Sequence, residues 1–374
     1  MNVFIVSNGI PKEKGKINGI FAFDQAKALS EIGYNVYFFV FDARSIRHKR
    51  ELGFSKYKFK GIPVYEYSFP LGRSPFWLLQ QVYRLCATRL FEEVKKDGLA
   101  LDLVHSHFYD ITYCVSDLKN KYGYKLIATE HYSGFINPNF KNKDKLFIRA
   151  THAYKNVDSL ITVSQSLADV IREKCNTNST VIHNIIDINA FSRCKSTHND
   201  DEKIRYISVG RLTGQKNFPL LINAFCKARK IQEKIVLDIY GDGELRESLN
   251  SKIIDSQATE FIKLHGAVDR KVLSDALLES DCFILLSDYE TFGVVYIEAI
   301  ASGIPVIATN CGGPSDFVNS QNGCLIECGD ENEAVNAIIY MSDNYKNYHS
   351  TNISEEIKSR FSPHTIARQI SALY

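Results

Sequence analysis

The sequence lacks a dominant charge, because its 374 residues include 45 Lys and Arg against 43 Asp and Glu, for a net charge of only +2. A chain this close to neutral offers no basic surface of the kind that nucleic-acid-binding proteins use to neutralise phosphates. It also lacks an apolar run long enough to span a bilayer. Its opening residues, MNVFIVSNGI, have too short an apolar stretch for a signal peptide and no basic residue before it. We therefore expect a soluble, cytoplasmic protein that does not bind nucleic acid.

The nine cysteines form no metal or disulfide pattern. Their number is odd, no two are spaced as CxxC, and the closest pair, Cys324 and Cys328, has no histidines nearby at zinc spacing. We interpret most of them as small buried apolar residues in a reducing compartment. A dinucleotide fingerprint is missing too, since the loop YGDGELRE has Arg246 where a third Gly would be needed.

What the sequence does contain is a regular alternation of short β-rich apolar runs with amphipathic helical segments. Continuous apolar runs separated by helices are typical of parallel sheets that are covered on both faces. The pattern therefore predicts an α/β protein built from two doubly wound domains. The expected strands are NVFIVS, NVYFFVF, PVYEY, DLVHS, KLIAT, SLITVS, TVIHN, IRYISVG, IVLDIYG, FIKLHG, CFILLS and PVIAT. The expected helices span residues 21–32, 76–96, 167–174, 218–230, 245–254, 272–278 and 292–301.

A polar, turn-rich segment without periodicity, residues 187–203, separates the two halves of the chain. We accordingly divide the chain into an N-terminal domain of residues 1–185 and a C-terminal domain of residues 186–352. A last helical stretch, residues 353–374, is interrupted by Pro363. Ligands of open parallel sheets bind at the carboxyl ends of the strands, so side chains that directly follow strands deserve the closest inspection.

Two cations follow the expected strand IRYISVG. Arg211 and Lys216 lie in a short loop before the next expected helix. Fixed cations at the carboxyl end of a strand can bind a diphosphate, and an Arg can contact two oxygens at once. The alternative is a solvated loop with two surface cations, which is the usual situation of isolated basic residues.

Two carboxylates, Glu290 and Glu298, frame the start of the expected helix 292–301. The N–H groups of Phe292 and Gly293 at that helix start would offer an anion site, and Gly293 would let a ligand approach the backbone closely. Glu290 would then accept hydrogen bonds from sugar hydroxyls, and Glu298 would reach a ribose diol. The alternative is that Glu290 only complements the helix dipole and that Glu298 lies on the surface. The apolar neighbours of Glu298 argue against an exposed position.

In the first half, His131 follows the expected strand KLIAT, a position that favours a role in binding or catalysis over a purely structural one. Adjacent side chains of a strand point to opposite faces, so a His131 directed at a ligand would turn Glu130 away from it. Asn18 and Gly19 end the loop after the first strand, NGIPKEKGKINGI, and form a candidate phosphate or acceptor loop. That loop matches neither a P-loop nor G-x-G-x-x-G.

These motifs resemble those of the retaining glycosyltransferases of family four. The E-x7-E pattern is present as Glu290 and Glu298, and the basic pair as Arg211 and Lys216 in GRLTGQKN. The segments CGGPSDFV, VIHNIIDINAF, DLVHSHF and TEHYSG match the family as well. The sequence departs from the usual pattern at three positions, with Asp316 in place of Glu, Ile185 in place of Gly and Asn18 in place of Gly. The resemblance covers essentially the whole chain and is most specific in the C-terminal half.

The resemblance implies the GT-B fold, with two Rossmann-like domains facing across a cleft and the helix 353–374 packed back on the first domain. It also implies a nucleotide-diphosphate sugar donor bound mainly by the second domain, with His131 approaching the transferred sugar from the first. No metal or other cofactor is expected, because cations and the helix start would neutralise the leaving group. The implied donor contacts are Arg211 and Lys216 for the diphosphate, Glu290, Phe292 and Gly293 for sugar and phosphate, and Glu298 for the ribose.

The implied activity is retaining transfer of a hexose from a UDP- or GDP-linked donor to a glycan or lipid-linked glycan acceptor, in cell-surface polysaccharide synthesis. A sugar-nucleotide epimerase and a non-catalytic sugar-nucleotide-binding protein are the alternatives with the same fold. An epimerase needs catalytic carboxylates at the sugar ring, for which the sequence shows no second motif, and the presence of Glu290, Arg211 and Lys216 argues against loss of the site. Residues 71–96 combine aromatic and basic side chains, so they form either a peripheral contact with the inner face of the membrane or an ordinary helix packed on its sheet.

Overall fold

The computed structural model describes residues 1–12, 19–45, 47, 50–72, 74–187, 190–191 and 203–374. The chain divides into two compact units. Unit 1 comprises Met1–Ile185 and Pro363–Tyr374, and unit 2 comprises Ile186–Ser362. None of the helices that the structure describes combines the length and the apolar character needed to cross a bilayer.

The sheet of unit 1 has the strand order β3-β4-β2-β1-β5-β6-β7-β8, and all neighbours are parallel except β3 and β4. Side chains alternate along β1, with Val3 and Ile5 in one buried cluster and Phe4 and Val6 in another, so both faces of the sheet are covered. The strands are β1 (Asn2–Ser7), β2 (Asn35–Asp42), β3 (Gly53–Phe59), β4 (Ile62–Ser68), β5 (Leu103–His107), β6 (Lys125–Glu130), β7 (Ser159–Thr162) and β8 (Thr180–Val181).

Strand β3 is an antiparallel edge strand that the sequence pattern did not predict. In its segment GFSKYKF every second side chain is exposed and none is fully buried, whereas the predicted strands are continuous apolar runs. The two-residue connection to β4, Lys60 and Gly61, has positive φ at both positions, 46° and 87°, as the tight turns of β-hairpins require. The expectation of a purely parallel sheet was therefore wrong for this edge.

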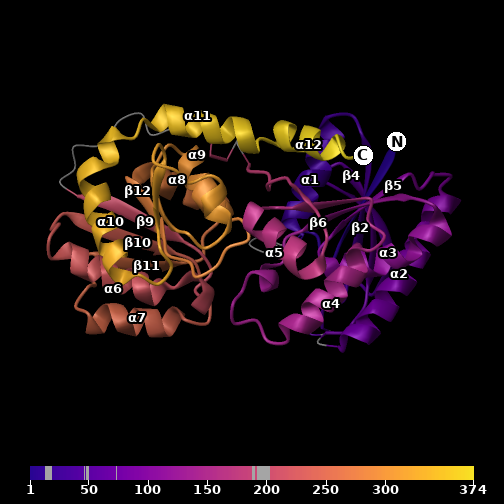
Figure 1. The fold of residues 1–374 in the computed structure, drawn as a ribbon, viewed down its shortest axis with the longest axis horizontal. Helices are drawn as coiled ribbons and strands as arrows, with labels where there is room; N and C mark the ends of the chain where they lie inside the picture. Colours follow the sequence, from indigo (N-terminus) through magenta and orange to yellow (C-terminus); the bar gives the residue numbers. More distant parts are fainter. Residues whose placement is uncertain (13–18, 46, 48–49, 73, 188–189, 192–202) are drawn as a thin grey trace. The chain divides into compact units, whose positions relative to one another are not determined.

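Helices cover the two faces of this sheet (Figure 1). On one face, α1 and α12 bring Phe23 and Ile366 into the same cluster as Val3, and on the other, α2 brings Leu90 against Phe4. The sequence pattern missed helices α3 and α4, although the buried side chains of both recur at the three- and four-residue spacing of an amphipathic helix. The helices are α1 (Ile20–Glu31), α2 (Phe76–Lys96), α3 (Tyr109–Tyr122), α4 (Lys143–Tyr154), α5 (Gln165–Cys175) and α12 (Pro363–Ser371).

The sheet of unit 2 is entirely parallel, in the order β11-β10-β9-β12-β13-β14. The sequence pattern missed only β14, a four-residue edge strand whose Leu325 is exposed. The strands are β9 (Ile204–Val209), β10 (Ile235–Tyr240), β11 (Ile262–Gly266), β12 (Cys282–Leu285), β13 (Val306–Thr309) and β14 (Gly323–Ile326). The helices are α6 (Phe218–Arg229), α7 (Arg246–Asp255), α8 (Arg270–Glu279), α9 (Val294–Ala301), α10 (Glu331–Asn344) and α11 (Ser350–Phe361).

The C-terminal helical stretch is shared between the units, which corrects its assignment as a whole to the first domain. Helix α11 belongs to unit 2, where Ile357 and Phe361 are buried and the hydroxyl of Ser354 donates to Ala301 of α9 over 2.6 Å. Ser362 is extended, as a residue before Pro usually is, and Pro363 then starts α12 on unit 1. The two buried faces therefore belong to two different cores.

Candidate functional site

Lys216 and Glu290 meet where the strand order of the unit 2 sheet reverses. The chain runs outward from β9 through β10 to β11, then returns to β12 beside β9 and continues through β13 to β14. Such a switch point is where open parallel sheets bind ligands. Lys216 ends a short 3₁₀ turn after β9, Glu290 follows β12, and the Lys216 ammonium forms an ion pair with Oε1 of Glu290.

Glu290 is rigidly held from two strand ends. Its carboxylate is only 5% exposed, and Oε1 also accepts a 2.8 Å hydrogen bond from the hydroxyl of Ser287. The Glu290 backbone N–H donates to the carbonyl of Cys311 over 3.0 Å, and its carbonyl accepts from the N–H of Gly313 over 2.8 Å. Within the described residues Oε2 has no hydrogen-bond partner, so one carboxylate oxygen is open to a ligand.

The two cations after β9 occupy different environments. The Lys216 side chain is 15% exposed and its stem packs over Gly210, where an added Cβ would lie 3.5 Å from Lys216 Cγ. An ammonium has three N–H donors, so the bond to Glu290 leaves donors for an anion. Arg211 is exposed, and its guanidinium makes no ion pair with any described residue. Lys216 is thus held in place, whereas the exposed Arg211 side chain can move toward a ligand.

The segment between Glu290 and α9 differs from the prediction, because the helix begins at Val294 rather than at Phe292. Gly293, the residue before the helix, has a φ of 90°, a left-handed backbone conformation that lies outside the helical range and that glycine adopts readily. The side chain of Phe292 is buried, with its ring 5.6 Å from that of Phe317, so only its backbone can face a ligand. An added Cβ on Gly313 would lie 2.3 Å from Phe292 Cα, so the glycine turn CGGPSDFV packs directly on this segment.

Glu298 is buried rather than on the surface, with 7% exposure. Its Oε1 accepts a 2.9 Å hydrogen bond from Arg270, whose other terminal nitrogen lies 3.4 Å from Asp187 Oδ2. Burial raises the pKa of Glu298, and Arg270 opposes that rise. The sequence search missed Arg270 although it follows the strand β11, the same criterion that singled out His131. An arginine between two carboxylates holds Glu298 in one orientation.

His131 of unit 1 is a buried, neutral imidazole. It lies directly after β6, is 6% exposed, and has Nε2 3.0 Å from Nδ1 of His107 on β5. The rings of His131 and His107 stack with centroids 5.2 Å apart, and Phe21 of α1 stacks on His131 at 5.6 Å. Burial lowers the pKa of His131 to about 3. The ring can therefore donate or accept a hydrogen bond, but it carries no charge at neutral pH.

Glu130 is committed to contacts within unit 1. Its Oε1 accepts backbone N–H bonds from His131 and Tyr132 over 2.8 and 2.7 Å, and its Oε2 accepts from the Tyr154 hydroxyl over 2.7 Å. Burial raises the pKa of Glu130 to about 7, although these three hydrogen bonds oppose the rise. The carboxylate is thus used to shape the turn that carries His131.

The candidate loop after β1 is only partly described. Gly19 has a φ of 74° and precedes α1, and an added Cβ would lie 2.0 Å from the carbonyl oxygen of Gly9. No other residue fits this contact between the two ends of the loop. Asn18 lies outside the described residues. Among the described residues no group of His, Cys, Asp and Glu could hold a metal ion, and independence of metals stays a prediction.

We expect His131→Gln to flatten the pH dependence of stability. The imidazole of the unfolded chain takes up a proton near pH 6.5, whereas that of the folded chain does so only near pH 3. Stability is therefore fully present above pH 6.5 and is lost as the pH falls, by about 1.4 kcal/mol per pH unit for this one group. The free energy of unfolding from urea titrations between pH 6.5 and 4 gives the slope for both proteins.

The matched control is His364→Gln, which changes an exposed imidazole on α12 of the same unit. We expect it to leave the slope as in the unmodified chain. Equal slopes for His131→Gln and the unmodified chain would show that His131 is not a buried neutral group.

Known proteins resemble this chain over much or all of its length. A 41.2 kDa protein from the cps region of Klebsiella pneumoniae is 28% identical over 254 residues, which are 63% of this chain and 67% of that protein. Sucrose-phosphate synthase from Thermosynechococcus elongatus superposes with a TM-score of 0.82 at 18% identity, covering 100% of this chain and 98% of that one. Anabaena HepE in complex with UDP-glucose gives 0.74 at 19%, with coverage of 100% and 98%. The two structures share the fold of this chain, two Rossmann-like α/β domains in the GT-B arrangement.

Two family models match consecutive parts of the sequence. Residues 19–190 match the model described as Glycosyltransferase Family 4, and residues 191–359 match that described as Glycosyl transferases group 1. The boundary between the matches falls in the polar segment that separates the two halves. The chain therefore belongs to the group 1, family 4 glycosyltransferases, enzymes of the GT-B fold that use nucleotide sugars.

Proposed function

We propose that this protein is a retaining glycosyltransferase that moves a hexose from a UDP- or GDP-linked donor to a glycan or lipid-linked glycan in cell-surface polysaccharide synthesis. The observation that carries the proposal is the Lys216–Glu290 ion pair at the switch point of unit 2, with the exposed guanidinium of Arg211, which has no ion pair among the described residues, nearby in sequence. Fixed positive charge and one open carboxylate oxygen suit a ligand that combines phosphate with hydroxyl groups.

In this proposal the diphosphate binds to Lys216 and Arg211, and the backbone N–H groups of Phe292 and Gly293 add further donors. The charge that develops on the leaving phosphate during transfer is stabilised by groups already in place before the reaction, which is the most effective form of electrostatic catalysis. Lys216 and Ser287 orient the Glu290 carboxylate, so that its free oxygen can hold a sugar hydroxyl.

Glu298 has the ribose as its proposed ligand. Its contact with Arg270 leaves the second carboxylate oxygen for a diol, and Arg270 keeps that oxygen from rotating away. No cofactor or metal takes part in this scheme, since the diphosphate charge is met by cations of the chain itself.

Retention in one step is the proposed stereochemical course. His131 has too low a pKa, about 3, to be an effective base at neutral pH, so it orients the sugar through a hydrogen bond. Both oxygens of Glu130 accept hydrogen bonds from its own turn and from Tyr154, which argues against a role as nucleophile. The leaving phosphate would then accept the proton of the attacking hydroxyl on the same face of the sugar.

The test is a transfer screen with UDP- and GDP-sugars in which the anomeric configuration of the product is read from NMR coupling constants. We expect an α-linked donor to give an α-linked product. An inverted product would contradict retention, and interconversion of the sugar without transfer would identify an epimerase instead. Binding of a nucleotide sugar without any turnover would identify a non-catalytic binding protein.

A peripheral contact with the inner face of the membrane is proposed for α2. Its outer side exposes Trp77 and Leu85, at 63% and 65%, together with Arg84 and Arg89. Aromatic and basic side chains on one helix suit an anionic lipid surface. We expect co-sedimentation with vesicles that contain phosphatidylglycerol, reduced several-fold by Trp77→Ala. Equal sedimentation of the two proteins would leave α2 as a helix packed on its sheet.

A further inference from the structure

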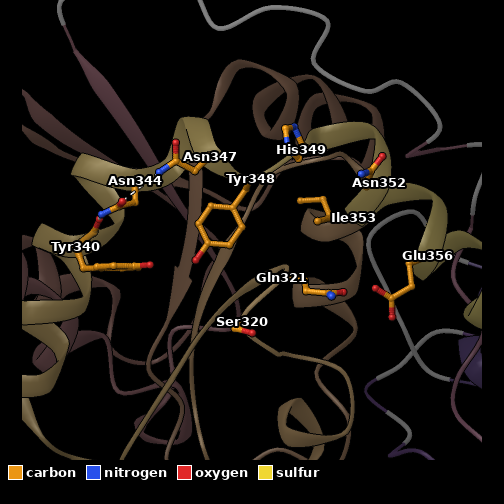
Figure 2. A pocket seen from close by; sticks show the side chains of 10 residues that line it. All are labelled: Ser320, Gln321, Tyr340, Asn344, Asn347, Tyr348, His349, Asn352, Ile353 and Glu356. Atoms are coloured by element: carbon orange, nitrogen blue, oxygen red, sulfur yellow. Dashed lines mark hydrogen bonds between the residues drawn. The ribbon is translucent and has the colours of Figure 1, made fainter.

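A second candidate site lies in unit 2 and has not been used by the proposed function. It is a cavity of about 410 Å³ between the loop before β14, the end of α10 and the start of α11 (Figure 2). Its volume falls in the range of small-molecule sites. The lining combines two tyrosine rings with four amide side chains: Tyr340, Tyr348, Gln321, Asn344, Asn347 and Asn352.

This cavity is separate from the diphosphate site. Gln321 precedes the amino end of β14, whereas Lys216 and Glu290 follow the carboxyl ends of β9 and β12. All strands of this sheet are parallel, so the cavity lies at their amino ends and the diphosphate site at their carboxyl ends. A ligand in the cavity therefore does not compete with the nucleotide for the same residues.

The chemistry of the lining favours a neutral ligand over an anion, because the only basic side chain among the lining residues is the imidazole of His349. No Lys or Arg is among the lining residues, and the one carboxylate, Glu356, is paired with Arg360 over 3.0 Å. Amide side chains offer both donors and acceptors, and tyrosine rings offer flat apolar faces. A sugar matches this lining, because it is a neutral ring with hydroxyl groups around its edge and C–H groups on its faces.

The lining groups are partly fixed and partly free. The Asn344 amide donates to the carbonyl of Tyr340 over 2.8 Å, and Asn347 donates to Asn344 over 3.1 Å, so these amides hold each other in place. The side chains of Gln321 and Asn352 have no hydrogen bond within the described part of the chain. In Figure 2 they lie on one side of the Tyr348 ring, with Tyr340 on the other. Tyr340 itself is 51% exposed, which leaves part of its side chain accessible to a ligand.

We propose that this cavity binds one neutral sugar unit of the glycan on which the enzyme acts. The inference rests on the proposed function, because only a transferase that meets a glycan has such units nearby. A second attachment point raises the effective concentration of the glycan at the enzyme without touching the reacting groups.

The test is saturation-transfer NMR of the protein with free glucose, galactose, mannose and N-acetylglucosamine, in the presence of saturating UDP and GDP. We expect a signal from at least one of these sugars. It should fall at least five-fold in Tyr340→Ala and in Asn352→Ala, both of which change exposed side chains. Asn336→Ala, an exposed amide on α10 outside the cavity, is the matched control and should keep the full signal.

No signal from any of the four sugars at saturating UDP and GDP, or a signal of equal strength in the unmodified chain, Tyr340→Ala and Asn352→Ala, would overturn the inference. The transfer screen described above is run on the same protein. Transfer without sugar binding at the cavity contradicts only the cavity site. Sugar binding at the cavity without transfer supports that site and contradicts the proposed function.

Discussion

Glu290→Gln is expected to lower sugar transfer by about 30- to 1000-fold at saturating donor, corresponding to about 2–4 kcal/mol of transition-state stabilisation. The side chain keeps its size and an oxygen for the hydroxyl of Ser287, so the fold should persist. What is lost is the negative charge that orients Lys216 and holds the sugar. Because both contacts matter most when charge develops on the leaving group, the loss should appear in kcat more than in KM.

The matched control for this variant is Glu331→Gln. Glu331 also pairs with a lysine of unit 2, Lys227, but that pair is more exposed and lies on α10 and α6. The Glu331→Gln variant should retain turnover and stability close to those of the unmodified chain, since exposed ion pairs contribute little to the free energy of unfolding. Turnover of Glu290→Gln near that of the unmodified chain would remove Glu290 from the reaction.

Lys216→Ala is expected to have the second large effect, on both binding and stability. Without the ammonium, Glu290 is left as a buried, unpaired carboxylate, a change that typically costs about 3–5 kcal/mol of stability. The affinity for a bare nucleoside diphosphate should fall as well, because a charge-assisted contact is worth about 1.5–3 kcal/mol. Calorimetric titration with UDP and GDP measures the affinity, and urea denaturation measures the stability.

Arg211→Ala separates these two effects. Arg211 is exposed and has no ion pair among the described residues, so its removal should weaken UDP or GDP binding by a similar amount and leave stability unchanged. The double variant with Lys216→Ala and Glu290→Gln should regain part of the stability lost in Lys216→Ala. Unchanged affinity in both single variants would leave these residues as ordinary surface cations.

The strands of both sheets could be predicted where burial on both faces makes the sequence continuously apolar, as in CFILLS and PVIAT. Prediction found the edge strands β8 and β11, as TVIHN and FIKLHG, and failed at the other two edge strands, β3 and β14. Every second side chain of β3 is exposed, and Leu325 of β14 is exposed, so neither strand is buried on both faces. Helix α10 was missed although its buried positions, Ala334, Ala337, Ile338 and Met341, follow the i, i+3, i+4, i+7 spacing of an amphipathic helix.

The site residues could be named from their positions after strands, yet their contacts could not. Nothing in the sequence distinguishes Lys216 from Arg211, and only the three-dimensional structure pairs the first with Glu290 and leaves the second exposed. The same holds for Arg270, whose partner Glu298 is 28 positions away. Burial of His131 depends on Phe21 and His107, which come from separate elements and meet only in the folded unit.

The most direct test of the donor site is a crystal structure of the protein soaked with UDP and, separately, with GDP. We predict density for a diphosphate in contact with the Lys216 ammonium and the Arg211 guanidinium, beside the backbone N–H groups of Phe292 and Gly293, with the ribose on Glu298. A nucleotide bound in any other part of unit 2, with the Lys216–Glu290 pair untouched, would contradict the assignment of the switch point as the donor site.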